Sequence, residues 1–216
     1  YSARQNAFVS ALPTRAQAVA VSPKSCELVL TAEYFNDSVH RFVIHRNGDL
    51  DDSGQSILTG TGPINLIFNP DGAFAFVAEN TGHSVGVLST LIPQNVVFLG
   101  STPSSLYPQS LAITRDGKHV FALTASNVDI FAFDPVAGSL MLERSFAHGL
   151  TISSYYGVDQ IALDARETKL FISGRGRVAA FTTYGLPLGN IAGVEGPGGI
   201  ATCPCTCNHH ARFEGA

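Results

Sequence analysis

Apolar and polar residues alternate in short runs along almost the whole chain, and glycine, proline, asparagine and aspartate separate the runs. One run, followed by its own turn, recurs four times. The copies are Ala18–Pro23, Asn65–Gly72, Ser110–Gly117 and Gln160–Arg166. Their spacing of roughly 45 to 50 residues is typical of a repeat built from four short strands. The pattern therefore predicts tandem β units rather than alternating strands and helices.

Each copy continues with further apolar runs, so the repeating unit holds four strands. The second runs are Leu28–Leu30, Phe74–Val77, Val120–Leu123 and Leu170–Ile172, and the third runs begin at Val39, Val85, Val128 and Val178. A weaker fourth run closes each unit, and no stretch shows the 3.6-residue period of a helix. The sequence predicts an all-β fold: a β-propeller of four-stranded antiparallel blades, with about four to five blades in this chain and helix confined to single turns.

The repeat also predicts where the blades begin and end. We expect a partial strand of a preceding blade at 1–14, blades at 15–60, 61–105, 106–150 and 151–197, and the start of a further blade or a Cys/His-containing tail at 198–216. The first strand of each blade is expected to be innermost, where strands crowd toward the axis. We therefore expect Ala20, Leu66, Ala112 and Ala162 to lie on equivalent inner strands and to be buried.

The best internal match sets Thr31–Val39 against Val77–Val85, which both keep Ala-Glu, four further residues and Ser-Val. Asp71-Gly72 and Asp116-Gly117 supply tight-turn signals, and the third run ends in a Gly-x-Leu turn in two copies. Together these features resemble the lactonase-like, YVTN-type propeller repeat of the 6-phosphogluconolactonase-like proteins. A seven-bladed ring of such repeats needs about 320 residues. The resemblance therefore implies an incomplete blade set: a fragment of a longer propeller, half of an assembled one, or a small closed ring.

The resemblance also implies a ligand-binding rim, formed by the turns between second and third strands together with the loops between blades. On that rim Glu79 or His83 could activate water for lactone hydrolysis, and Arg175 could hold an anionic group. The expected ligand-binding residues are Glu33, Asn36, Asn80, Tyr107, Tyr155 and Arg177. The alternative is that Glu33 and Glu79 pair with local backbone amides and that His83 is solvated.

Three cysteines and two histidines lie close together near the end of the sequence: Cys203, Cys205, Cys207, His209 and His210. These are ligand types for zinc or copper(I). Their Cys-x-Cys-x-Cys spacing is tighter than that of common zinc sites, and a second paired half is missing. The sequence therefore favours no metal here, and we expect no cofactor.

Composition narrows the function classes further. The chain carries 13 Lys plus Arg, 17 Asp plus Glu and a net charge of -4, without a basic run, which argues against nucleic-acid binding. No apolar stretch approaches the ~20 residues that a membrane-spanning helix needs. The absence of an initiator Met leaves the compartment open, with a lean toward an extracytoplasmic or secreted location.

Three functions remain open. The first is a non-catalytic binding or assembly module that presents a rim or a blade edge to a protein partner. The second is a lactone hydrolase acting on an anionic sugar lactone, and the third is a secreted carbohydrate-binding propeller. A homo-oligomer, or further blades from a longer chain, could complete the ring. The sequence does not decide whether the chain is an enzyme.

Overall fold

A computed structural model describes residues 16–25, 27–45, 49–152 and 160–192. These residues form sixteen β-strands and a single turn of 3-10 helix, η1 (Tyr34–Asn36). Within the described ranges no helix is long and apolar enough to cross a membrane. The prediction of an all-β protein with helix confined to single turns is confirmed.

The strands form four sheets, each built from one continuous stretch of chain, which we call blades 1 to 4. Blade 1 holds β1 (Ala16–Val21), β2 (Leu28–Glu33), β3 (Ser38–Ile44) and β4 (Leu50–Leu58). Blade 2 holds β5 (Pro63–Phe68), β6 (Phe74–Glu79), β7 (Ser84–Ser89) and β8 (Val97–Pro103). Blade 3 holds β9 (Ser110–Ile113), β10 (His119–Leu123), β11 (Asn127–Asp134) and β12 (Ser139–Ala147). Blade 4 holds β13 (Ile161–Leu163), β14 (Lys169–Gly174), β15 (Arg177–Thr182) and β16 (Pro187–Ala192).

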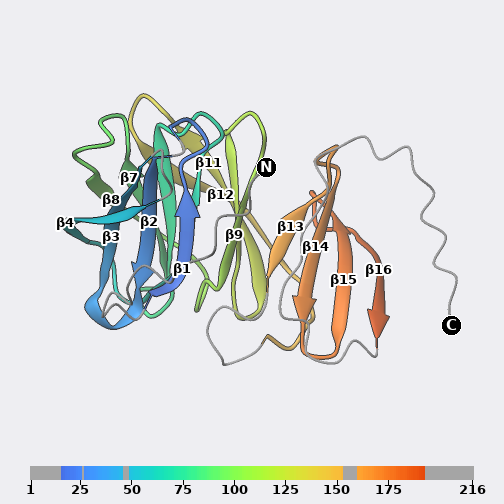
Figure 1. Ribbon diagram of the computed structural model, residues 1–216. Helices are drawn as coiled ribbons and strands as arrows, with labels where there is room; N and C mark the ends of the chain where they lie inside the picture. Colours follow the sequence, from blue (N-terminus) through green and yellow to red (C-terminus); the bar gives the residue numbers. More distant parts are fainter. Residues whose placement is uncertain (1–15, 26, 46–48, 153–159, 193–216) are drawn as a thin grey trace, which may run out of the picture.

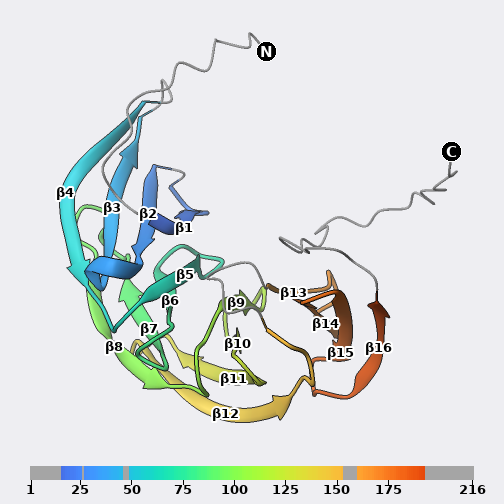
Figure 2. The same ribbon diagram turned by 90° about the horizontal axis from the view of Figure 1, so that it is seen from below.

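Every blade is an antiparallel meander in which each strand pairs with the next. The blades stand side by side along an arc, with the first strands on its inner side and the fourth strands on its outer side (Figures 1 and 2). This arrangement of four-stranded sheets about a common axis is a β-propeller.

Three hydrophobic cores hold neighbouring blades together. The core between blades 2 and 3 is the most aromatic, because Phe133 packs edge-on against Phe74 and Phe76 with ring centroids 4.9 and 4.8 Å apart. The core between blades 1 and 2 is mainly aliphatic and includes Leu30 and Val77. Each blade thus uses one face of its sheet for the blade before it and the other for the blade after it.

The four residues predicted at the centre all lie on first strands, as expected, but their predicted burial holds only for Leu66. Leu66 is 3% exposed and packs toward blade 1, whereas Ala20, Ala112 and Ala162 are half-buried. The three alanines stand one strand position out of phase with Leu66, so they occupy the opposite face of their strands. The first strands, on which these alanines lie, form the inner side of an arc that the four described blades do not close into a ring (Figure 2).

Candidate functional site

The turns between second and third strands share one edge of the molecule with the linkers between blades. In blades 2, 3 and 4, equivalent backbone bonds tie the turn to the linker before the blade: Gly82 N–H donates to Thr61 O, Ala125 N–H to Leu106 O, and Arg175 N–H to Thr151 O. We call this edge the linker rim; it comprises the turns 34–37, 80–83, 124–126 and 175–176 and the linkers 59–62, 104–109 and 148–152. Glu79, His83 and Arg175 all stand at this rim. These three residues occupy similar positions in their repeats, and they therefore lie at the same edge of the molecule.

Glu79 lies at the end of β6, and its carboxylate is fully buried. Oε1 accepts the backbone N–H of Gly60 at 2.7 Å, and Oε2 accepts the hydroxyls of Ser84 at 2.5 Å and Ser101 at 2.6 Å. Both oxygens of the carboxylate therefore accept hydrogen bonds, from three donors in all. This geometry favours the alternative in which Glu79 has a structural role and binds neighbouring groups of the protein. Through these bonds Glu79, on the second strand, connects the linker before blade 2 to the third and fourth strands.

Blade 3 places a carboxylate in the same setting but on a different strand. At the position equivalent to Glu79 it has Thr124, while Asp129 on β11 replaces Gly86 of β7. Asp129 is fully buried and accepts the N–H of Ser105 at 2.5 Å and the hydroxyl of Ser145 at 2.6 Å. We call the buried carboxylate, with the linker amide and the fourth-strand serine that it binds, the blade latch. The sequence analysis missed Asp129, since only the strand register shows that it stands opposite Ser145.

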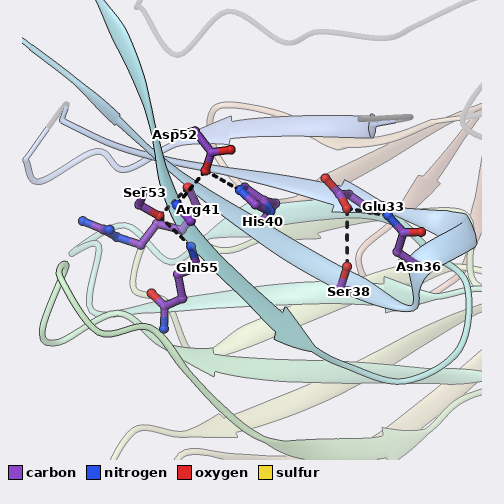
Figure 3. A network of polar contacts seen from close by, with 9 residues as sticks. Glu33, Asn36, Ser38, His40, Arg41, Asp52, Ser53 and Gln55 are labelled. Atoms are coloured by element: carbon purple, nitrogen blue, oxygen red, sulfur yellow. Dashed lines mark hydrogen bonds and ion pairs between the residues drawn. The ribbon is translucent and has the colours of Figure 1, made fainter. Parts of the chain in front are cut away.

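Blade 1 has the corresponding glutamate without the full set of partners. Oε2 of Glu33 accepts hydrogen bonds from Nδ2 of Asn36 at 2.9 Å and from the hydroxyl of Ser38 at 3.5 Å. Figure 3 shows the three side chains facing one another. Glu33 is 3% exposed, and within the described residues its Oε1 has no hydrogen-bond partner. On the neighbouring strands His40 and Asp52 point toward one another, with Nε2 and Oδ1 2.6 Å apart (Figure 3).

His83 and Tyr107 contact one another on the linker rim, where His83 is half-buried and Tyr107 is exposed. Both have left-handed backbone conformations, with φ of 51° and 56°. The backbone N–H of Tyr107 donates to Nδ1 of His83 at 3.1 Å, and the two rings meet edge to face with centroids 4.5 Å apart. Because Nδ1 accepts this bond, the neutral imidazole carries its hydrogen on Nε2. The ring therefore presents a donor rather than a lone pair.

The remaining predicted rim residues differ in how far they can reach a ligand. Asn80 is buried and donates from Nδ2 to Pro108 O at 3.0 Å, so it braces the next linker. Asn36, Arg175 and Arg177 are exposed. Tyr155 and the Cys203–His210 segment lie outside the described residues. In the part of the chain that is described, no group of three or more His, Cys, Asp and Glu side chains is placed to hold a metal ion.

His148, in the linker after blade 3, is a buried histidine that sequence analysis did not single out. It is 5% exposed; Nε2 donates to Thr124 O at 3.2 Å, and Nδ1 accepts the N–H of Leu150 at 3.1 Å. Burial lowers the pKa of His148 below its ordinary value of 6.5, and the bond to Thr124 O opposes this effect only in part. The neutral ring thus serves as a brace between the linker and the turn of blade 3.

The fold is shared with solved propeller structures. A functionally unknown protein from Desulfotomaculum acetoxidans DSM 771 is 40% identical over 88% of this chain and 62% of its own, with a TM-score of 0.84. The periplasmic gluconolactonase PpgL of Pseudomonas aeruginosa is 17% identical over 85% of this chain and 55% of its own, with a TM-score of 0.70. The β-propeller domain of Cps50 (Swd1) from Myceliophteria thermophila is 10% identical over 85% of this chain and 62% of its own, with a TM-score of 0.67.

These similarities support the fold more strongly than a function. With the two distant structures, a gluconolactonase and the β-propeller domain of Cps50 (Swd1), this chain shares only the fold at such low identity. The chain spans less than two thirds of the length of each of the three structures. No protein-family model matches this sequence, and no curated protein matches it.

Proposed function

We propose that this chain is a non-catalytic propeller module that binds a protein partner across its linker rim. The observation that carries the proposal is that both candidate bases on this rim are already engaged. Glu79 is fully buried with three donors, and the lone pair on Nδ1 of His83 accepts the N–H of Tyr107. A general base needs a lone pair directed at the proton that it removes.

The exposed part of the same rim carries three large apolar or aromatic side chains among its polar residues. Phe35 is 63% exposed, Leu106 58% and Tyr107 45%. Exposed aromatic side chains of this kind are enriched in protein interfaces and often contribute most of the binding energy. The surface therefore supports binding of a protein better than catalysis.

Side-chain contacts connect the rim residues from blade 1 to the linker 104–109, which precedes blade 3. The ring of Tyr34 packs edge-on against Phe35 at 5.1 Å between centroids. Tyr34 also borders Gly62, where an added Cβ would come within 2.8 Å of its ring and would collide with Thr81. His83 follows on the same turn as Thr81 and contacts Tyr107. A partner that lies across this path would contact three blades at once.

Two measurements test this proposal. The first is hydrolysis of gluconolactone and 6-phosphogluconolactone, where we expect no rate above spontaneous hydrolysis for the wild type or for His83→Ala. Hydrolysis that His83→Ala abolishes would overturn the proposal in favour of the lactonase alternative.

The second measurement compares partner binding by wild type and Phe35→Ala/Tyr107→Ala, with crosslinking mass spectrometry to locate the contacts. The matched control is Leu91→Ala/Ile92→Ala, which removes two side chains of similar exposure (64% and 59%) at the opposite end of blade 2. We expect the rim variant to lose its partner and the control to keep it. Equal binding by both variants, or crosslinks confined to the control surface, would contradict the proposal.

A further inference from the structure

A cavity lies away from the linker rim, between blades 3 and 4. It is a groove of about 470 Å³, and its polar residues include Asp116, His119, Glu143, Arg144 and Glu167. A volume of this size is within the range of small-molecule sites, about 300–1,000 Å³. The groove belongs to the edge that carries the turns between first and second and between third and fourth strands.

The groove exists because the junction between blades 3 and 4 lacks the aromatic filling of the junction before it. His119 begins β10 where Phe74 begins β6. Thr183 occupies the place of Phe133, since each donates its backbone N–H to the residue just before the second strand, Thr168 O and Lys118 O respectively. At the earlier junction Phe74 and Phe133 pack with ring centroids 4.9 Å apart. At the junction between blades 3 and 4, His119 and Thr183 thus stand where Phe74 and Phe133 stand at the earlier junction. The smaller, polar side chains leave a groove with polar walls.

The walls combine an aromatic ring with fixed charged groups. Tyr184 is 73% exposed, and the guanidinium of Arg144 lies 5.0 Å from its ring centroid. Nε2 of His119 and Oε2 of Glu143 are 3.5 Å apart. One oxygen of Glu167 accepts the backbone N–H of Arg115 at 2.5 Å, which fixes the carboxylate at the groove. The buried side chains of Phe121 and Ile130 form an apolar floor.

We propose that this groove binds a neutral saccharide. A sugar ring has an apolar face that packs on an exposed aromatic ring, and hydroxyl groups that donate to carboxylates and accept from a guanidinium. Three carboxylates face one guanidinium in the groove, so an anionic ligand would be repelled. Arg144, already placed over Tyr184, disfavours a cationic ligand at the ring.

The test titrates wild type with cellobiose, maltose and diacetylchitobiose by calorimetry and saturation-transfer NMR. Gluconate and glucosamine serve as the anionic and cationic probes. We expect at least one neutral disaccharide to bind and to show saturation transfer, and both charged probes to bind more weakly. Failure of all three disaccharides to bind, or preferential binding of either charged probe, would overturn the proposal.

Three variants locate the binding. Tyr184→Ala should weaken affinity roughly tenfold through the loss of ring stacking. His119→Phe/Thr183→Phe should fill the groove as the earlier junction is filled and abolish binding, with the melting temperature showing that the variant folds. The control Leu91→Ala should bind as wild type does. Unchanged affinity in both groove variants would show that the saccharide binds elsewhere and would reject the site.

Discussion

Blades 2 and 3 place a buried carboxylate at the same point from different strands. Blade 2 uses Glu79 at the end of its second strand and has Gly86 on its third strand, where an added Cβ would collide with Oε1 of Glu79. Blade 3 has Thr124 at the first position and Asp129 at the second. In both cases the carboxylate binds a linker amide and a serine of the fourth strand. What the two blades share is therefore the position of the charge in space.

The terminal blades differ from this inner pair. In blade 1 Glu33 occupies the position equivalent to Glu79, yet its Oε1 has no hydrogen-bond partner within the described residues. In blade 4 the two positions are Gly174 and Ala179, so the strand register provides no latch carboxylate there. The exposure of the inner strands agrees: Val19 is 65% exposed, whereas the equivalent Leu66 is 3% exposed. Among the described residues the latch is complete in blades 2 and 3 alone.

The largest effect is expected for Glu79→Ala. It leaves three donors without their acceptor: the buried Ser84, the half-buried Gly60 and the exposed Ser101. Each such loss destabilises, because a hydrogen bond to a carboxylate contributes about 1.5–3 kcal/mol. Since the losses are not additive, we expect the free energy of unfolding to fall by about 3 to 4 kcal/mol. Equilibrium urea unfolding measures this change. Ser101→Ala, which removes one of the three donors, is the graded control, and a loss below about 1 kcal/mol for Glu79→Ala would rule out a latch.

Transplanting the latch of blade 3 into blade 2 sharpens the comparison. Glu79→Thr removes the carboxylate, and Gly86→Asp alone forces a second one against it, so each single change should destabilise. The double variant Glu79→Thr/Gly86→Asp recreates the residues of blade 3 and should be more stable than the sum of the single effects by about 1 to 3 kcal/mol. Additive losses in a double-mutant cycle would mean that the two latches are not equivalent.

The sequence predicted the repeat well because apolar runs and turn residues are local signals. The runs Phe74–Val77 and Val120–Leu123, for example, both became second strands, β6 and β10. Burial of Ala20 was wrong because the face that a strand residue occupies depends on its phase, and a shift of one position reverses it. The local sequence pattern does not show which face of the strand a residue occupies when the residues on either side of it are also small or apolar.

The site was harder to predict because its geometry joins residues from different blades. Glu79 was predicted as a candidate base because its hydrogen-bond partner could not be identified from the sequence. That partner, the amide of Gly60, belongs to the preceding linker, and only the fold brings the two together. The groove between blades 3 and 4 depends on Thr183, which takes in blade 4 the position that Phe133 has in blade 3. These two residues lie far apart in the sequence. A comparison of the copies, position by position, was the signal that could have identified both.

Glu33 allows the inner and terminal latches to be compared with the same substitution. Glu79→Gln places an amide NH₂ among three donors and should destabilise by about 1.5 to 3 kcal/mol. Glu33→Gln should change the free energy of unfolding by less than about 1 kcal/mol, because its carboxylate accepts only the side chains of Asn36 and Ser38 among the described residues. Chemical unfolding of the two variants side by side gives the difference. Equal losses would show that Glu33 has a latch partner of comparable strength.

The smallest effect concerns pH and the linker between blades 3 and 4. Since burial lowers the pKa of His148 in the folded protein, the unfolded chain takes up the proton first as the pH falls. The stabilisation is therefore fully present above the unfolded value of 6.5 and is lost as the pH falls through it toward the folded value. Asp52, Asp116 and Asp164 have lowered pKa values and stay ionised in this range, so their effects are confined to pH values below about 4.

We accordingly expect the melting temperature of wild type to decrease from about pH 7.5 to about pH 5, and His148→Gln to flatten part of that decrease. The glutamine retains a donor for Thr124 O, so the variant should be destabilised only slightly at high pH, where the neutral histidine is already favourable. Thermal unfolding of both proteins at each pH makes the comparison. If the two profiles stay parallel, the proton taken up in this range binds elsewhere, and the linker before blade 4 is braced no differently at pH 5 than at pH 7.5.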